Sequence, residues 1–358
     1  MSTPLKIFLT GATGYIGGDI LYQLNEQYPD FTYALLIRSE DKAKTVRSRY
    51  PKARIVSGGN DDAAALEREA AWADVVIREF SVLVTIRGYV NANVKDTADS
   101  SDHAGAAEAL AKGLVQGHSA SRPGFWLHTG GAGILTYFDS EVNKMFGEED
   151  NKVFNDLDGI DERVDEIVLN TGIDHGDVVK TAIVAPPTIY GQGRGPASNR
   201  GRQVYELVSF ILKEGYCPRI GKGLSRWNNV HVHDLSRLFE RLVQAATDPS
   251  LQANPEVWAG RGYYFAENGE HVWGEVSTAV GQEAFKQGLV KGGPPELRDL
   301  SINEAVNSSA GFEAGSWGMN SRGVAERARK VLGWKPQERG LYDELPDIVR
   351  SEAARMNL

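Results

Sequence analysis

The chain has 358 residues, of which 41% are hydrophobic and 24% are charged, and its formal net charge is −9. This composition predicts a globular protein with a sizeable core, built as one large α/β domain with a smaller lobe or as two domains. The negative charge argues against nucleic acid or an anionic membrane as the main partner. A single cysteine, Cys217, excludes an internal disulfide.

Signals for export, membrane insertion and metal binding are absent from the sequence. The N-terminus has neither the basic nor the apolar region of a signal peptide, and no apolar run reaches transmembrane length. The seven histidines are scattered without a zinc-like spacing, so no metal is expected. We therefore expect a cytoplasmic protein with a small-molecule substrate and no nucleic-acid or membrane partner. The oligomeric state stays open.

Strands and helices alternate along the first half of the chain. Because each expected strand is a short apolar run, the pattern predicts an α/β fold with a mostly parallel, doubly wound sheet covered on both faces. The expected strands are 6–10, 31–38, 53–58, 73–77, 125–129 and 178–187, and the helices are 14–26, 41–47, 63–71, 104–115 and 164–169. Beyond these come a loop at 191–202, helices at 203–214, 234–246 and 273–285, and a late strand at 262–266.

The stretch "GATGYIG" joins the first strand to the first helix. Gly11 permits a tight turn, Gly14 lets the backbone approach a diphosphate, and Gly17 lets the helix pack against the sheet. The N–H groups and dipole at the start of the helix favour that anion. The sequence thus predicts a dinucleotide site at Gly11, Thr13, Gly14, Tyr15, Ile16 and Gly17.

The end of the second strand indicates which dinucleotide binds. NAD-binding units usually carry a carboxylate there, which bonds the ribose 2′-hydroxyl. This chain has Arg38 and Ser39 instead, and a guanidinium suits a 2′-phosphate, so NADP(H) is favoured over NAD(H). A surface role for Arg38 is the alternative. Asp61 is a candidate acceptor for the adenine amino group, although Asp61 or Asp62 could equally cap the next helix.

Three stretches in order carry a family resemblance: "TGATGYIGG" at the start, "PPTIYGQG" in the middle and "VHVHDL" later. With them the chain resembles the extended and atypical short-chain dehydrogenase/reductases, and most closely the fungal NmrA-like or epimerase/dehydratase-like branch. The resemblance implies a Rossmann-type NADP-binding domain at 1–187. It also implies that 188–358 is mostly a C-terminal substrate lobe with segments returning to the first domain.

The resemblance fails at the residues that carry the chemistry. The superfamily usually has a Ser after the fifth strand and a Tyr-x-x-x-Lys on the next helix, which exchange a proton with the substrate. Here Gly130 stands where the Ser is expected, and no tyrosine has a lysine four residues on. Either another group supplies the proton in a carbonyl or imine reductase, or the protein binds cofactor without turnover as a redox sensor. A nucleotide-sugar epimerase or dehydratase is a third alternative. The candidate catalytic residues are Thr129, Tyr137, Lys144 and Tyr190.

A segment at 78–95 separates two stretches that run together in relatives of this type. It is either an additional loop near the nicotinamide or translated non-coding sequence. By resemblance, the turn after the sixth strand also passes the nicotinamide, although a rigid turn that serves only the fold is equally consistent. Its residues are Pro186, Pro187, Thr188 and Ile189, and Thr129 is expected beside them.

Two polar groups later in the chain have a functional and a structural interpretation. The loop 191–202 carries arginines that could bind an anionic group, although a solvated loop is the alternative. His231 and His233 lie two residues apart, but the sequence offers no obvious further metal ligands. We expect local hydrogen bonds for these histidines and a helix cap for Asp234.

Overall fold

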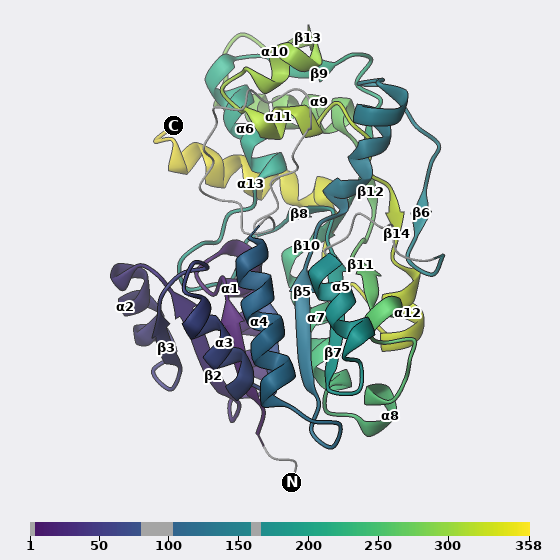
Figure 1. The fold of residues 1–358 in the computed structure, drawn as a ribbon. Coiled ribbons are helices and arrows are strands. Elements are labelled where there is room, and N and C mark those ends of the chain that lie inside the picture. Colours follow the sequence, from purple (N-terminus) through teal and green to yellow (C-terminus); the bar gives the residue numbers. More distant parts are fainter. Residues whose placement is uncertain (1–3, 80–102, 159–165) are drawn as a thin grey trace.

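A seven-stranded sheet forms the centre of the molecule in the computed structural model, which describes residues 4–79, 103–158 and 166–358 (Figure 1). The strands are all parallel, in the order β11-β7-β5-β4-β1-β2-β3. They are β1 (Lys6–Thr10), β2 (Thr32–Ile37), β3 (Arg54–Ser57), β4 (Val75–Arg78), β5 (Gly124–Thr129), β7 (Val179–Ala185) and β11 (Tyr263–Phe265). The predicted α/β fold with a Rossmann-type parallel sheet is confirmed.

Helices cover both faces of this sheet. On one face α3, α4 and α5 pack side by side, and on the other α1 packs against α7 (Figure 1). The helices of this part are α1 (Tyr15–Gln27), α2 (Glu40–Arg49), α3 (Ala63–Trp72), α4 (Ala104–Gly117), α5 (Glu166–Asp174), α7 (Val232–Ala245), α8 (Pro249–Gln252) and α12 (Glu326–Leu332). Covering both faces explains why the central strands β1, β4 and β5 are buried almost continuously, rather than on alternate residues only.

The first strand and helix illustrate how the core forms. Ile7, Phe8 and Leu9 of β1 are all buried, because each side of the strand meets a helix. In α1 the buried residues Ile20 and Leu24 are four positions apart and lie on one helix face. The later elements α7, β11 and α12 add their apolar side chains to this same core.

The second half of the chain builds a separate lobe with its own apolar core (Figure 1). A three-stranded sheet of order β12-β10-β8 lies where the lobe meets the central sheet. The lobe's strands are β8 (Thr188–Tyr190), β9 (Cys217–Ile220), β10 (Arg226–His231), β12 (Glu270–Val272) and β13 (Leu297–Leu300). Its helices are α6 (Gln203–Glu214), α9 (Trp273–Lys286), α10 (Ile302–Val306), α11 (Phe312–Ser316) and α13 (Leu341–Arg355).

Short elements complete the fold. After β5 the chain forms a 3₁₀-helix, η1 (Ala132–Thr136), and then a π-helix, η2 (Phe138–Asn143). The strands β6 (Phe154–Asn155) and β14 (Gly323–Val324) pair with each other, and η3 (Ala259–Arg261) precedes β11. Of the predicted segment 78–95, only Arg78 and Glu79 belong to the described residues.

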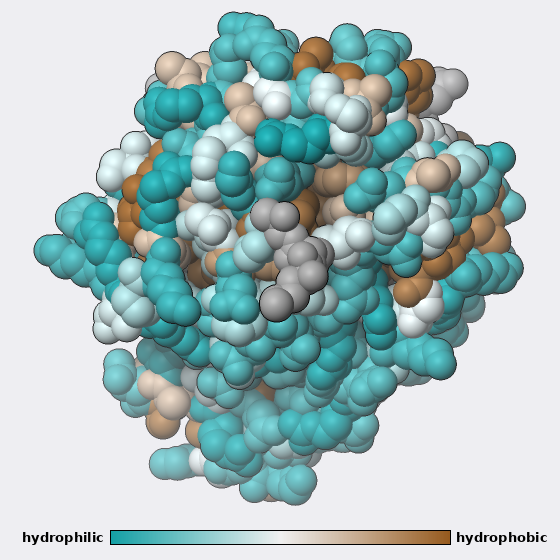
Figure 2. Space-filling view, turned by 90° about the horizontal axis from the view of Figure 1, so that it is seen from below, coloured by the Kyte–Doolittle hydropathy of each residue, from teal (hydrophilic) through white to brown (hydrophobic). Residues whose placement is uncertain are grey.

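The face seen in Figure 2 is mostly hydrophilic, with small separate hydrophobic patches. Within the described ranges, no helix has both the length and the apolar composition needed to span a membrane.

Candidate active site

The candidate site lies along the edge where the parallel strands end. Gly11 follows β1, Arg38 follows β2, Thr129 ends β5 and Pro186 follows β7. The order β7-β5-β4-β1-β2 therefore places these residues in one row. Neighbouring strands are about 4.8 Å apart, so the ends of β2 and β5 are separated by about 14 Å. Such a row has room for a ligand that lies extended across the strand ends.

The glycine turn has the backbone geometry that the sequence predicts. Gly11 has a φ of +73°, and its carbonyl accepts the N–H of Gly14 at 2.8 Å. A Cβ added to Gly17 would lie 2.5 Å from the carbonyl oxygen of Gly11, so any side chain there would force α1 away from the turn. Gly14 caps α1 without a side-chain hydrogen bond, and the first turn of α1 carries no acidic residue. The positive end of α1 thus faces the turn.

One acidic side chain lies against this turn. Glu79 follows β4, and a Cβ added to Gly11 would overlap its carboxylate. A Cβ added to Gly14 would lie 3.3 Å from Glu79 Oε2. The glycines therefore create the space that a diphosphate needs, while the Glu79 carboxylate places a negative charge in that space. The shape of the turn fits the diphosphate of the cofactor. The Glu79 carboxylate has to move away when the diphosphate binds, because both groups are negatively charged.

The other residues predicted at the turn pack around it. Ile16 is buried and Thr13 is half-buried. The Tyr15 hydroxyl donates to the carbonyl of Gly191 at 2.5 Å, and Tyr205 of α6 donates to the same oxygen at 2.7 Å. The side chain of Tyr15 thus fastens the start of α1 to the loop that follows β8.

The end of β2 carries a cation and no carboxylate. Arg38 is exposed, and its Cδ lies 3.6 Å from the position of a Cβ added to Gly59, in the loop after β3. Ser39 caps α2 by accepting the N–H of Lys42 at 3.4 Å. This geometry leaves the Arg38 guanidinium in solvent beside the loop, where a phosphate can reach it.

In the structure Asp62 caps the next helix, and Asp61 does not. Asp62 caps α3 by accepting the N–H of Ala65 at 3.1 Å. The Asp61 carboxylate contacts His103 Nε2 at 2.8 Å, and His103 Nδ1 in turn accepts the N–H of Ala106 at the start of α4. Asp61 therefore links the loop after β3 to α4, beside the strand end that Arg38 occupies.

Two buried hydroxyl groups lie at the other end of the row. Thr129 is the last residue of β5, and Thr188 begins β8 just after the turn of Pro186 and Pro187. Both side chains are fully buried, and in the described part of the chain neither hydroxyl has a hydrogen-bond partner. The N–H of Ala132 donates to the Pro186 carbonyl at 2.9 Å, which holds η1 against this turn. A buried hydroxyl without a partner is costly, so a polar group brought to either of these positions would be stabilising.

The remaining catalytic candidates lie in different surroundings. Tyr190 is fully buried, donates to the carbonyl of Arg339 at 2.8 Å, and has its pKa raised by burial. Lys144 is exposed and ends η2 in a left-handed conformation. Tyr137 is half-buried between η1 and η2, with its ring centroid 6.4 Å from that of Phe154. Ile189 is half-buried in β8. The Tyr190 hydroxyl is already hydrogen-bonded and Lys144 lies in solvent, so neither is favoured as the proton donor.

The arginines of the loop 191–202 are held by carboxylates of the chain itself. Arg194 donates through its backbone N–H, Nε and Nη2 to the fully buried Asp19 of α1. Arg200 pairs with Glu352 at 2.7 Å, and Arg202 pairs with Glu313 at 2.7 Å. The loop is therefore fixed to α1, α13 and α11. The sequence analysis did not select Asp19; the signal was a carboxylate in the middle of the apolar stretch "YIGGDIL".

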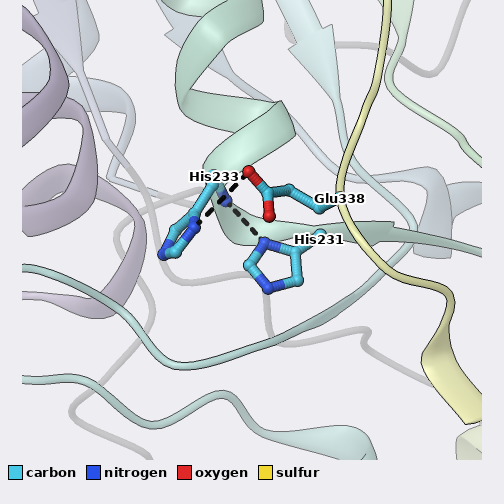
Figure 3. Close-up of side chains that lie close together, drawn as sticks. All are labelled: His231, His233 and Glu338. Carbon is cyan, nitrogen blue, oxygen red and sulfur yellow. Dashed lines mark hydrogen bonds and ion pairs between the residues drawn. The ribbon is translucent and has the colours of Figure 1, made fainter. Parts of the chain in front are cut away.

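His231, His233 and Glu338 place three possible metal ligands within 4.8 Å of one another (Figure 3). Two of the three residues accept hydrogen bonds from protein donors. His231 Nδ1 accepts the backbone N–H of His233 at 3.1 Å, and Glu338 Oε1 accepts from Arg237 at 2.6 Å. Burial lowers the pKa of His231 to about 4, so its ring is neutral and can accept. These hydrogen bonds fix the start of α7.

The cap of α7 corrects one expectation. His231 is the N-cap residue, whereas Asp234 was expected to have that role. The Asp234 carboxylate accepts the backbone N–H groups of Gln337 and Glu338 at 2.9 and 3.0 Å. It thereby holds the segment before α13 against α7.

Comparison with known proteins gives relatives over the whole length. No family model matches the chain. "Oxidase ucsJ" of Acremonium sp is 38% identical over an alignment of 370 residues, and this alignment covers 99% of this chain and 99% of that protein. An uncharacterized protein of Saccharomyces cerevisiae is 26% identical over 348 residues, covering 95% of this chain and 98% of the yeast protein.

Solved structures share the fold at low sequence identity. UDP-glucose 4-epimerase of Thermotoga maritima, with UDP-glucose, has a TM-score of 0.63 at 14% identity over 98% of this chain and 100% of the epimerase. The dTDP-glucose 4,6-dehydratase DesIV of Streptomyces venezuelae, with NAD and TYD bound, has a TM-score of 0.65 at 16% identity over 98% of this chain and 97% of DesIV. The likeness thus includes the C-terminal lobe as well as the parallel sheet.

Proposed function

Because the chain belongs to the same family as the Acremonium oxidase ucsJ, we propose that it is an NADP(H)-dependent oxidoreductase that reduces a small carbonyl or imine compound. The observation that supports this most is the row of strand ends, in which the glycine turn stands between a cationic end at Arg38 and a hydroxyl-bearing end at Thr129. NAD bound to DesIV, which has the same fold, agrees with a nicotinamide cofactor.

We propose the following placement of the cofactor. The N–H groups at the start of α1 bind the diphosphate, with Gly11, Gly14 and Gly17 leaving room for it. Arg38 binds the 2′-phosphate, and Asp61 lies on the adenine side of the row. The nicotinamide then lies beside Thr129 and the turn of Pro186 and Pro187. When bound, the reduced cofactor supplies a hydride to the substrate.

The residues of the chain determine where the substrate proton comes from. The sequence has no Tyr-x-x-x-Lys pair, so the usual proton donor of such enzymes is missing. The Thr129 hydroxyl, which is buried in the structure, becomes accessible when cofactor and substrate bind and holds the substrate oxygen or nitrogen by a hydrogen bond. Tyr137 is the nearest phenol in sequence to that strand end. An imine that is protonated at neutral pH accepts hydride without a protein acid, whereas a ketone needs one. The missing pair therefore favours an imine over a ketone.

A substrate panel tests this proposal. Purified protein is incubated with NADPH and a series of aldehydes, ketones and cyclic imines, and the loss of NADPH absorbance is followed. We expect turnover with at least one imine, reduced by Thr129→Val. Binding of NADPH without turnover across the panel would contradict the enzyme proposal and favour the alternative, a cofactor-binding redox sensor. That alternative is supported by the missing proton donor. A nucleotide-sugar epimerase or dehydratase is less favoured, since that chemistry depends on the tyrosine.

A further inference from the structure

A polar cavity lies beside α1. It has a volume of about 430 Å³ and is formed between α1, the end of α2 and the loop that follows β8. Its walls are Tyr22, Arg49, Gly193, Arg194, Gly195, Pro196, Ala197 and Asn199. Arg49 is the last residue of α2, nine positions after Glu40 at its start. At a rise of about 1.5 Å per residue, Arg49 is about 13 Å from the helix end beside Arg38, so this cavity is separate from the proposed 2′-phosphate position.

Two guanidinium groups face the same aromatic ring in this cavity. The Arg194 guanidinium carbon lies 4.6 Å from the Tyr22 ring centroid, and that of Arg49 lies 5.4 Å from it. Arg49 Nη1 also donates to the Gly195 carbonyl at 3.2 Å, which holds the side chain over the loop. The positions of both cations are therefore fixed by contacts, and each borders the cavity.

Arg194 has a carboxylate partner, whereas Arg49 has none in the described ranges. Arg194 is neutralised by the fully buried carboxylate of Asp19, whose pKa is lowered by its hydrogen bonds with Arg194. Arg49 has no carboxylate within 4 Å among residues 4–79, 103–158 and 166–358. The cavity thus combines a guanidinium that has no carboxylate partner in the described ranges, a half-buried aromatic ring and a glycine-rich main chain. These are the features of a site for an oxyanion.

We propose that this cavity binds a small phosphorylated ligand, with the phosphate on Arg49 and the organic part against Tyr22. The guanidinium offers two parallel N–H donors to phosphate oxygens, and the volume exceeds what a single phosphate ion fills. The loop that lines the cavity also packs on α1, since a Cβ added to Gly18 would lie 3.0 Å from the Cα of Gly195. A ligand here would therefore order the loop against the helix that carries the glycine turn.

Calorimetric titration at low ionic strength tests the proposal. The probes are inorganic phosphate and ribose 5-phosphate, each added to protein that is already saturated with NADPH. We expect one equivalent of each probe to bind, with ribose 5-phosphate binding more tightly. Arg49→Gln should weaken binding at least tenfold, and Arg49→Lys should restore most of it. Arg47→Gln is the matched control, because Arg47 lies on the same helix and pairs with Glu40 at 2.6 Å.

The outcomes separate this proposal from the proposed function. If no probe binds, or if Arg49→Gln binds as the unaltered protein does, the proposal is wrong whatever the enzyme assay shows. If the probes bind to protein without NADPH but not to the NADPH-saturated protein, the phosphate was occupying the cofactor turn, which also contradicts the proposal. If NADPH itself does not bind, the titration is run without it, and the Arg49 dependence still decides the question.

Discussion

The Glu79 carboxylate lies in the space that Gly11 and Gly14 leave free at the start of α1. A negative charge there opposes the diphosphate that the turn is shaped to receive. The relationship gives the cofactor site a measurable electrostatic cost, and it makes the site's occupancy sensitive to one side chain at the end of β4.

Removing this charge should tighten cofactor binding. Glu79→Gln keeps the size of the side chain and removes the negative charge from the space where the diphosphate is placed, so NADPH should bind more tightly. Quenching of tryptophan fluorescence by NADPH measures the change. Glu108→Gln on the exposed face of α4 is the control and should leave the affinity unchanged. Weaker binding in Glu79→Gln would mean that Glu79 supports the turn instead of opposing the cofactor.

Arg38 should determine the choice between the two dinucleotides. Arg38→Ala should weaken NADPH binding about tenfold, or about 1.4 kcal/mol, and leave NADH binding within about twofold, since only NADPH carries the 2′-phosphate. Arg38→Asp should reverse the preference. Calorimetric titration with both cofactors gives the four affinities for each protein. An equal loss for NADPH and NADH would show that Arg38 acts on the fold and not on the phosphate.

Replacing Thr129 should raise the stability of the protein and lower its activity. Thr129→Val replaces a buried hydroxyl that has no partner in the described residues, so the free energy of unfolding should rise by about 1 kcal/mol. The same change should lower kcat/KM about 100-fold, because the substrate loses a hydrogen bond that strengthens in the transition state. Denaturant unfolding and steady-state kinetics measure the two effects.

A neighbouring threonine gives the matched control for Thr129. The buried Thr136 hydroxyl donates to the Gly133 carbonyl at 2.7 Å, so Thr136→Val leaves that carbonyl without its donor. It should lose about 1–3 kcal/mol of stability. If Thr129→Val were destabilised to the same extent, Thr129 would have a structural hydrogen bond and no role at the substrate.

Asp139 should make stability depend on pH. Burial raises its pKa to about 6 from 3.8, and its carboxylate accepts from the backbone and side-chain amides of Asn320. A raised pKa in the folded state means that stability from this group is present below pH 4 and is lost as the pH rises through 6. The full effect is about 3 kcal/mol. Asp139→Asn, which keeps the acceptor, should therefore be more stable than the unaltered protein at pH 8 and not at pH 4.

A second buried carboxylate distinguishes this effect from the loss of a hydrogen bond. Asp156 has its pKa raised to about 6 by burial, but its two oxygens accept the backbone N–H groups of Phe265, Glu326 and Arg327. Asp156→Asn replaces one of these two oxygens by an NH₂ group, which would face a backbone N–H and could not accept its hydrogen bond. Asp156→Asn should therefore be destabilised at every pH. Unfolding curves at pH 4, 6 and 8 measure both variants. A pH-independent difference for Asp139→Asn would contradict the assignment.

Local sequence signals located the elements of the central sheet. The predicted bounds of β1 (Lys6–Thr10) and α6 (Gln203–Glu214) are those of the structure. In β1 an apolar run ends at a glycine, and α6 ends at Gly215, whose φ of 76° stops a helix. The strands β8, β10 and β12 were not predicted, because strands of three to six residues in a small mixed sheet have no clear period.

The features of the site that the sequence did not reveal depend on contacts between distant parts of the chain. Arg194 lies 175 residues from Asp19, and Arg200 lies 152 residues from Glu352, so no local pattern reveals that these arginines are already paired. The same is true of Tyr190, whose hydroxyl donates a hydrogen bond to the backbone carbonyl of Arg339. By contrast, the glycine turn is local, and its backbone geometry followed from the spacing of Gly11, Gly14 and Gly17 alone.

The most direct test is a calorimetric titration of the purified protein with NADPH and with NADH. One NADPH should bind per chain, more tightly than NADH by at least threefold, and Gly14→Val should abolish the binding while the protein remains folded by circular dichroism. No heat with either cofactor, or unchanged binding in Gly14→Val, would contradict the assignment of the glycine turn and with it the proposed oxidoreductase.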